Sequence, residues 1–255
     1  MKRNVRAYAP SFLTVTNLLL GFSAVIAAAN YGNFQLAAVL IIIAAVIDAL
    51  DGKVARFMHT TGDFGRELDS LADIVSFGMA PSYLVYVSCF AGLERWDPAG
   101  SLLGIALSAS PLVFGALRLA RFNLDETDGE HHDNFAGLPI PAAAITLASF
   151  ILFNFRIWGR MELVALMVPL VLLVSLLMVS RVQYLAMPRL TFRDTKKNQV
   201  KLILLLVGVL ALIMFKSLAL FPTTILYIGI GVVKRLRGVA IKPAEEEDAF
   251  NDTVF

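Results

Sequence analysis

Four aspartates follow one another at helical spacing within a short stretch of the chain. They are Asp48 and Asp51, three residues apart, and Asp69 and Asp73, four residues apart. Residues at these separations lie on one face of an α-helix, so each pair presents its carboxylates together. A short polar turn, HTTGDFG, separates the pairs. Two antiparallel helices joined by such a turn can point all four carboxylates at one another.

Converging carboxylates repel one another, and the neighbouring Lys53 and Arg56 cannot neutralise four negative charges. Oxygen-rich clusters suit Mg²⁺, Mn²⁺ or Ca²⁺, whereas Zn²⁺ prefers histidine and cysteine ligands. The chain has a single cysteine, Cys89. We therefore predict a divalent metal site. The alternative is that these carboxylates lie at helix ends, where they reach water and pair with nearby arginines.

Small residues beside the aspartates leave room for a substrate. Gly52 and Ala55 lie one turn apart and form a notch, which serves either close helix packing or the binding of a flat base or a pyrophosphate. Arg56, at the edge of the notch, is placed to meet a phosphate oxygen. Asn17 and Thr14 form a polar pair in the first apolar stretch. This pair serves either hydrogen bonding between helices or contact with a nucleotide.

The elements that must position these residues are membrane helices. Of the 255 residues, 58% are apolar and 16% are charged, and the mean hydropathy is +0.72. Soluble domains carry about 45–50% apolar and about 25% charged residues, so the composition excludes a soluble enzyme and a basic nucleic-acid-binding domain. A polytopic, all-α helical bundle is predicted. Its spans, about eight in number, are expected at 11–30, 36–57, 67–91, 101–121, 137–156, 162–181, 199–216 and 218–234.

The positive charges predict the orientation of these helices. With the N-terminus in the cytoplasm, all but four of the 22 Lys and Arg residues fall on the cytoplasmic side. The four exceptions are Arg95, Arg156, Arg160 and Lys216. Both termini and the aspartates are therefore expected at the cytoplasmic face of the inner membrane. Residues 1–241 are expected to form one membrane domain and 242–255 an acidic, flexible tail.

The spacing around the aspartates resembles the signature of the CDP-alcohol phosphotransferases. The matching residues between 48 and 73 are Asp48, Asp51, Gly52, Ala55, Arg56, Gly65, Asp69 and Asp73. The resemblance implies a six-helix core with two further helices, and cleavage of a CDP-linked lipid. It also implies two divalent metals, Mg²⁺ or Mn²⁺, held by the four aspartates, with Asp73 as general base. The CDP headgroup is then expected to contact Asn17, Asp48, Gly52, Ala55, Arg56 and Gly65.

Three further segments resemble the phosphatidylserine synthase branch of that family. They are SFGMAPSYL at 76–84, RLARFN at 118–123 and FAGLPIPAAA at 135–144. Without the resemblance, the first segment indicates a Gly-Pro kink, the second indicates basic residues that flank a membrane span, and the third indicates the start of a helix. The reaction implied is transfer of the phosphatidyl group from CDP-diacylglycerol to L-serine, with release of CMP. Arg118 and Arg121 are then expected to bind the carboxylate of the acceptor.

The sequence is also compatible with other acceptors, with another lipid and with another class of protein. Glycerol phosphate, inositol phosphate or choline could be the acceptor, although a phosphorylated acceptor needs a denser cationic pocket, and the lipid could be archaeal. A cation transporter is the alternative from another class. Transporters show matching interrupted helices in two halves, whereas the second half here contains one acidic residue near its spans, Glu162. The partners expected are the two substrates, the bilayer and a second copy in a homodimer, and not nucleic acid.

Overall fold

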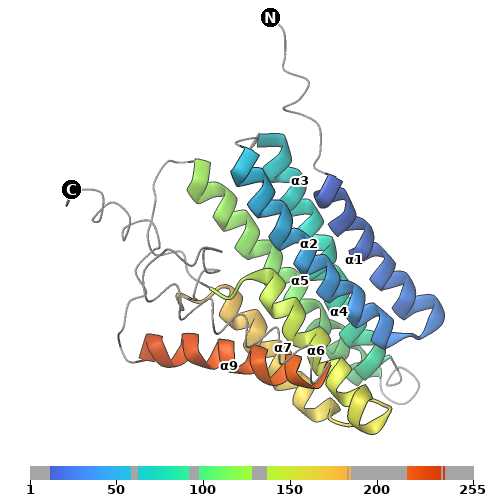
Figure 1. Cartoon of the computed structure of the whole chain (residues 1–255). Helices are drawn as coiled ribbons and strands as arrows, with labels where there is room; N and C mark the ends of the chain where they lie inside the picture. The colour runs from blue at the N-terminus through green and yellow to red at the C-terminus, as the bar shows by residue number, and fades with distance from the viewer. Residues whose placement is uncertain are drawn as a thin grey trace, which may run out of the picture.

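Helices account for all the regular structure in the part of the chain that the structure describes (Figure 1). The structure is a computed structural model and describes residues 12–58, 63–91, 98–127, 137–182, 184, 217–236 and 238. The α-helices are α1 (Phe12–Tyr31), α2 (Phe34–Met58), α3 (Asp63–Asp73), α4 (Ala80–Val85), α5 (Pro98–Thr127), α6 (Ile140–Trp158), α7 (Val164–Met178) and α9 (Ser217–Leu236). The predicted all-α class is confirmed.

The helices agree with the predicted membrane spans. Six helical stretches are long and apolar enough to cross a membrane, and α7 is a shorter apolar helix. These seven coincide with seven of the predicted spans, and the remaining one, 199–216, lies outside the described residues. The main differences are at helix ends, since α5 runs on to Thr127 and α6 begins only at Ile140. The chain is a multi-pass membrane protein.

The third span changes its helical geometry directly after Asp73. A π-helical segment, Ile74–Met79, joins α3 to α4, and a second π-helical segment, Tyr86–Phe90, follows α4. The N–H of Ala80 bonds to the carbonyl of Val75, five residues earlier. Pro81 has no N–H to continue an α-helical ladder at this point. The sequence predicted a kink here, and the structure has a π-helical segment, a feature that is frequent at functional sites.

Helix α1 packs closely against this π-helical segment. A Cβ atom on Gly21 would lie only 2.6 Å from the Cα atom of Ser76, so the two backbones approach because Gly21 has no side chain. The hydroxyl of Ser76 donates a hydrogen bond of 2.9 Å to the carbonyl of Asn17. The N-terminal end of α1, the ends of α2 and α3 that face the turn between them, and the C-terminal end of α5 lie at one end of the bundle (Figure 1).

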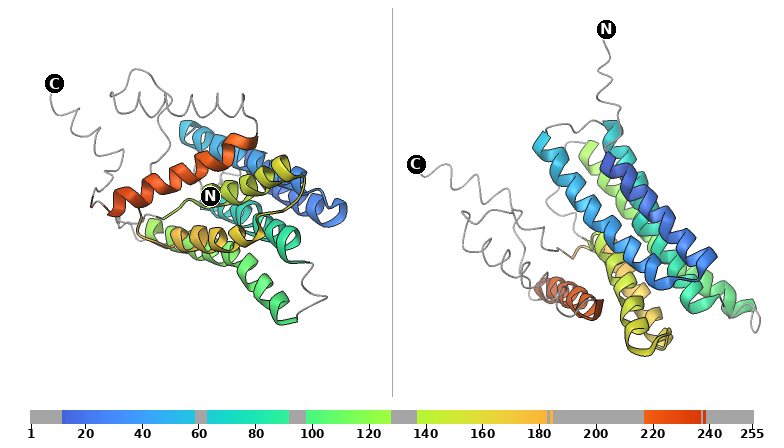
Figure 2. Two further views of the ribbon diagram at one scale, coloured as in Figure 1. Left: turned by 90° about the horizontal axis from the view of Figure 1, so that it is seen from below. Right: turned by 45° about the vertical axis from the view of Figure 1, so that its right-hand side comes forward.

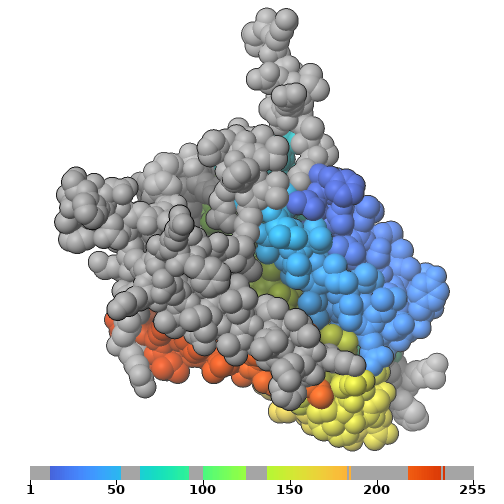
Figure 3. Space-filling model, viewed as in Figure 1, coloured from blue at the N-terminus to red at the C-terminus, as the bar shows by residue number. Residues whose placement is uncertain are grey.

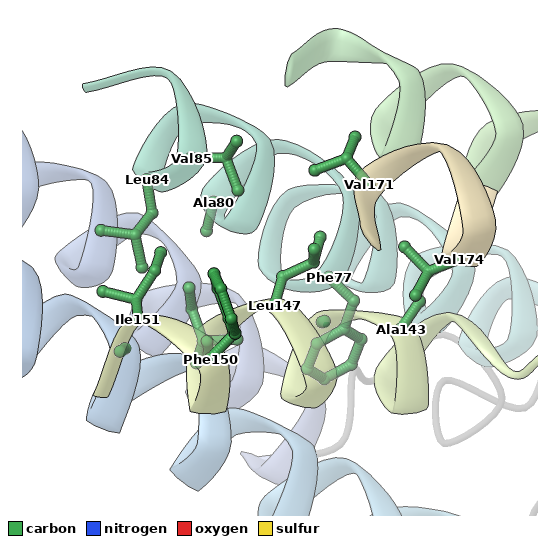
Figure 4. Packing of buried hydrophobic residues seen from close by; sticks show 14 of the residues in the cluster. Phe77, Ala80, Leu84, Val85, Ala143, Leu147, Phe150, Ile151, Val171 and Val174 are labelled. Carbon is green, nitrogen blue, oxygen red and sulfur yellow. The ribbon is translucent and has the colours of Figure 1, made fainter. Parts of the chain in front are cut away.

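The apolar core joins the third span to α6 and α7. Figure 4 shows side chains from these three parts of the chain pointing toward one another. Those labelled are Phe77, Ala80, Leu84, Val85, Ala143, Leu147, Phe150, Ile151, Val171 and Val174. All are buried. Burial of a large apolar side chain stabilises packing by about 1.5–3 kcal/mol in water, and inside lipid it acts mainly through van der Waals contact.

The start of α6 is tied to the end of α7. The N–H groups of Gly137 and Leu138 donate to the carbonyls of Val182 and Leu177, over 2.8 and 2.9 Å. Gly137 has φ +122°, a conformation that other residues rarely adopt. The FAGLPIPAAA segment therefore begins α6 as predicted, with Pro139 just before the helix and Pro141 in its first turn.

Helix α9 crosses the other helices at a steep angle instead of running along them. Figure 2 shows it almost end-on in the view where α1 to α5 are seen lengthwise. On another side, α1 and α2 form one continuous outer face (Figure 3). Their exposed side chains include Val15, Leu19, Phe22, Val39, Ile43 and Val46. Such an apolar exterior suits contact with lipid chains.

Candidate active site

Three carboxylates converge from two helices. Asp48 lies in α2, and Asp69 and Asp73 lie in α3, with oxygen atoms that all fall within 4.8 Å of one another. Asp48 and Asp69 are half-buried, and Asp73 is only 8% exposed. Carboxylates so close together and so shielded from water repel unless a cation lies between them. Their oxygen donors fit a hard divalent cation such as Mg²⁺ or Mn²⁺.

Asp51 lies beside this group and does not belong to the set within 4.8 Å. Its side chain is buried, and one carboxylate oxygen, Oδ2, accepts a hydrogen bond from the hydroxyl of Thr14 on α1. The charge of Asp51 nevertheless acts on both Asp48 and Asp69. The spacing predicted four converging carboxylates, and the structure has three in one group with the fourth adjacent to it.

Asn17 on α1 faces the same cluster. Its Nδ2 donates a hydrogen bond of 3.3 Å to Oδ1 of Asp73. The Asn17 side chain is fully buried, and its Oδ1 accepts no hydrogen bond from the described residues. The sequence left open whether this residue bonds between helices or contacts a ligand. The structure contains the bond between helices, together with an unsatisfied buried acceptor of the kind that a bound donor satisfies.

The predicted small-residue notch has open space beside it. A Cβ atom added to Gly52 or to Gly65 would meet no atom of the described residues within 4 Å. Ala55 and Arg56 belong to the same helix as Gly52, α2, and their side chains lie outside the part of the chain that the structure describes. Among the described residues, no neighbouring helix packs its side chains into the space beside these two glycines. A ligand can approach the backbone of α2 and α3 at these two positions.

The two arginines predicted to bind the acceptor differ in their surroundings. Arg118 on α5 is half-buried and lies within electrostatic range of the Asp73 carboxylate. Its Nε atom is buried and has no hydrogen-bond partner among the described residues. Arg121, three residues closer to the helix end, is exposed. The structure thus brings Arg118 to the cluster and leaves Arg121 facing outward.

Several residues near the site were not predicted. Asn123 exchanges hydrogen bonds with Ser70, with oxygen–oxygen and nitrogen–oxygen distances of 3.4 and 3.2 Å, and its Nδ2 lies 3.5 Å from a Glu67 oxygen. This contact ties α5 to α3, and its sequence signal was the last position of RLARFN. Tyr184 and Tyr227 lie far along the chain from the aspartates, and no local pattern marks them.

Known proteins resemble this chain closely. A sequence model described as CDP-alcohol phosphatidyltransferase matches residues 7–174, which include all four aspartates. A CDP-diacylglycerol–serine O-phosphatidyltransferase of Helicobacter pylori is 35% identical over 231 residues, covering 89% of this chain and 90% of the relative. An archaetidylserine synthase of Methanothermobacter thermautotrophicus is 35% identical over 182 residues, covering 69% of this chain and 68% of the relative.

A third relative matches a shorter region. A CDP-diacylglycerol–serine O-phosphatidyltransferase of Bacillus subtilis is 35% identical over 140 residues, which are 55% of this chain and 73% of the relative. All three names contain serine; two of them name CDP-diacylglycerol, and the third names archaetidylserine.

Proposed function

The chain belongs to the CDP-alcohol phosphatidyltransferase family, and we propose that it transfers the phosphatidyl group of CDP-diacylglycerol to L-serine, forming phosphatidylserine and CMP. The observation that carries the proposal is the convergence of Asp48, Asp69 and Asp73 within 4.8 Å. Relatives named for this reaction cover most of the chain, which supports serine as the acceptor. Membership of this family also removes the reason to consider a cation transporter.

The four aspartates would together hold two divalent metal ions, Mg²⁺ or Mn²⁺. Metal bound there would polarise the pyrophosphate and offset the negative charge that develops on the departing CMP. Asp48 and Asp69 present half-buried oxygen donors, and Thr14 fixes one oxygen of Asp51. The donor set contains carboxylate oxygens alone, which supports a hard cation.

Asp73 is the general base. The serine hydroxyl oxygen attacks the phosphorus that bears diacylglycerol, the bond from that phosphorus to the CMP oxygen breaks, and the hydroxyl proton passes to the Asp73 carboxylate. Asn17 donates to Oδ1 of Asp73, which leaves Oδ2 as the oxygen that receives the proton. A base must lie within hydrogen-bond reach of the proton it takes, and a fixed carboxylate meets that need.

The CDP headgroup binds along α2 and the start of α3. Asn17 and Asp48 contact it from the cluster, and Arg56 meets a phosphate oxygen. Gly52, Ala55 and Gly65 form the surface against which it lies. The open space beside Gly52 and Gly65 supports this placement.

The acceptor binds between the cluster and α5. Its carboxylate requires a cation, and Arg118 lies within electrostatic range of Asp73, where the acceptor hydroxyl must be placed. Arg121 is exposed and attracts the acceptor to the mouth of the site. This arrangement favours an acceptor that carries both a hydroxyl and a carboxylate.

The protein lies in the cytoplasmic membrane with both termini and the active site on the cytoplasmic side, and it forms a homodimer. The distribution of Lys and Arg in the sequence supports the orientation. Residues 1–241 form one catalytic domain, with 242–255 as an acidic tail. Diacylglycerol chains stay in lipid while the CDP headgroup reaches the cluster.

A second candidate concerns the lipid. The archaetidylserine synthase relative covers two thirds of this chain, so a CDP-linked archaeal lipid is a reasonable alternative donor with the same acceptor. Glycerol phosphate, inositol phosphate and choline have no such support among the relatives described above.

An acceptor panel tests the proposal. Purified protein is mixed with radiolabelled CDP-diacylglycerol, Mn²⁺ or Mg²⁺, and one alcohol at a time, and CMP release and the lipid product are measured. L-serine is expected to give phosphatidylserine at the highest rate, and Asp69→Asn to abolish it. Glu67→Gln, an exposed acidic residue on the same helix, is the matched control and should retain activity. Fast transfer to another alcohol and none to serine would refute the proposal.

A further inference from the structure

A series of polar side chains from three separate parts of the chain begins at Arg118, the arginine that interacts with Asp73. Arg118 comes from α5, Tyr227 from α9, and Tyr184 from the segment that follows α7. Arg118 lies within electrostatic range of both Asp73 and Tyr227. The rings of Tyr184 and Tyr227 pack at a centroid distance of 5.5 Å with an angle of 35° between their planes. The three side chains therefore form one polar patch of successive neighbours, in which Arg118 is the member that interacts with the proposed base.

Two hydrogen-bonding atoms in this patch are buried without a partner among the described residues. They are Nε of Arg118 and the hydroxyl oxygen of Tyr184. Leaving such a group unsatisfied in a buried site costs about 1–3 kcal/mol, and native structures rarely tolerate it. Two of them in one patch indicate a position where a polar ligand binds.

The chemistry of the two atoms defines the ligand. An arginine Nε–H can only donate, and a planar guanidinium matches the two oxygens of a carboxylate. Burial, and then the neighbouring Tyr227, raise the pKa of Tyr184 to about 12, so its hydroxyl is a neutral donor at physiological pH. Two neutral hydroxyls and a single guanidinium suit an anion with one negative charge better than a phosphate.

We propose that Tyr184 and Tyr227 act with Arg118 as the site that binds the carboxylate of an amino-acid acceptor and selects such acceptors over other alcohols. This inference rests on the proposed function, because it assigns the substrate-selecting residues of the same site. A hydroxyl and a carboxylate on neighbouring carbons, as in L-serine, can reach Asp73 and Arg118 at once. The tyrosines then supply selectivity from the C-terminal part of the chain, beyond the region that the family model matches.

Helix α9 positions Tyr184 through a glycine. A Cβ atom on Gly231 would lie 2.7 Å from Cδ1 of the Tyr184 ring, so the ring rests directly on the helix backbone. Gly231→Ala would displace the ring and leave its hydroxyl chemically intact. A Cβ atom on Gly229, in the same helix, would meet no atom of the described part of the chain within 4 Å, so Gly229→Ala is the matched control.

The test measures KM for L-serine and for CDP-diacylglycerol in the parent protein and in Tyr184→Phe, Tyr227→Phe, Gly231→Ala and Gly229→Ala. Each tyrosine variant is expected to raise the KM for L-serine about tenfold, as for the loss of one hydrogen bond to a charged group. Gly231→Ala should raise the same KM, and Gly229→Ala should not. The KM for CDP-diacylglycerol should stay the same in all four.

L-serine methyl ester, which keeps the hydroxyl and masks the carboxylate, separates recognition from a structural effect. Its KM should not change in the tyrosine variants. An unchanged KM for L-serine in both tyrosine variants, or an equal rise for the ester and for L-serine, overturns the inference while the proposed function stands. If the parent protein itself does not transfer to L-serine, the proposed function fails and the inference fails with it.

Discussion

Asn17 on α1 donates a hydrogen bond from its Nδ2 to Oδ1 of Asp73 on α3, over 3.3 Å, and both side chains are buried. The two residues belong to different membrane helices that meet where Gly21 lies against Ser76. The first helix is therefore part of the candidate site. In the proposed mechanism, the Asn17 amide determines which oxygen of Asp73 faces the acceptor.

The base role of Asp73 leads to a specific kinetic prediction. Asp73→Asn should lower the rate of transfer about 10²–10⁴-fold, the usual contribution of a positioned general base. Affinity for CDP-diacylglycerol should change little, because the base acts in the transition state. Binding of the lipid and turnover at saturation are the two measurements. Weak lipid binding with normal turnover at saturation would make Asp73 a binding residue instead.

Asp48, Asp51 and Asp69 should behave as metal ligands that have no further role as base. Asp48→Asn, Asp51→Asn and Asp69→Asn should each lose activity and weaken the binding of divalent metal together, because each removes one charged ligand. Titration with Mn²⁺, followed by electron paramagnetic resonance, measures the affinity directly. If one of these variants keeps near-normal turnover in limiting Mn²⁺, the aspartate that it replaces is not a metal ligand.

Thr14 should tune the metal site through Asp51. Its hydroxyl donates to Oδ2 of Asp51, so Thr14→Val removes the hydrogen bond and keeps the side-chain shape. Loss of a residue that orients a ligand typically costs about 10–100-fold in metal affinity or activity. Thr16→Val is the control, because that hydroxyl donates to the carbonyl of Phe12 on its own helix. Equal effects of the two substitutions would contradict the role of Thr14.

The orientation in the membrane can be tested with one cysteine. After Cys89 is replaced, a cysteine placed between residues 59 and 64 should react with a membrane-impermeant thiol reagent from the cytoplasmic side alone. Inverted vesicles and intact cells give the two arms of the measurement. Labelling of intact cells would place the aspartate cluster on the outer side.

The sequence predicted the helices and the aspartate cluster, because both depend on patterns between residues that are close in the chain. Apolar stretches long enough to cross a bilayer indicated the helices, and the spacing of Asp48, Asp69 and Asp73 indicated that their carboxylates meet. Both inferences need only the regular geometry of a helix, because that geometry determines from residue spacing alone how long a helix is and which side chains share a face. The position of Asp51, just outside the group, depends on the Thr14 hydroxyl from another helix.

Features that depend on packing between distant segments were not predictable. Arg118 and Arg121 have the same sequence signal, and burial against neighbouring elements alone separates them. The rings of Tyr184 and Tyr227 pack together, and the sequence, which predicted the span at 218–234, did not predict this contact or the steep angle of α9 to the other helices (Figure 2). The π-helical segment after Asp73 likewise reflects Pro81 and the close approach of α1.

In the proposed reaction, the serine hydroxyl attacks the lipid-side phosphorus of CDP-diacylglycerol. L-serine labelled with ¹⁸O in its side-chain hydroxyl tests this step, with the masses of both products measured by mass spectrometry. Phosphatidylserine is expected to carry the label and CMP to lack it, and neither product should form in Asp69→Asn. Label in the CMP, or CMP release without labelled phosphatidylserine, would contradict direct transfer to serine.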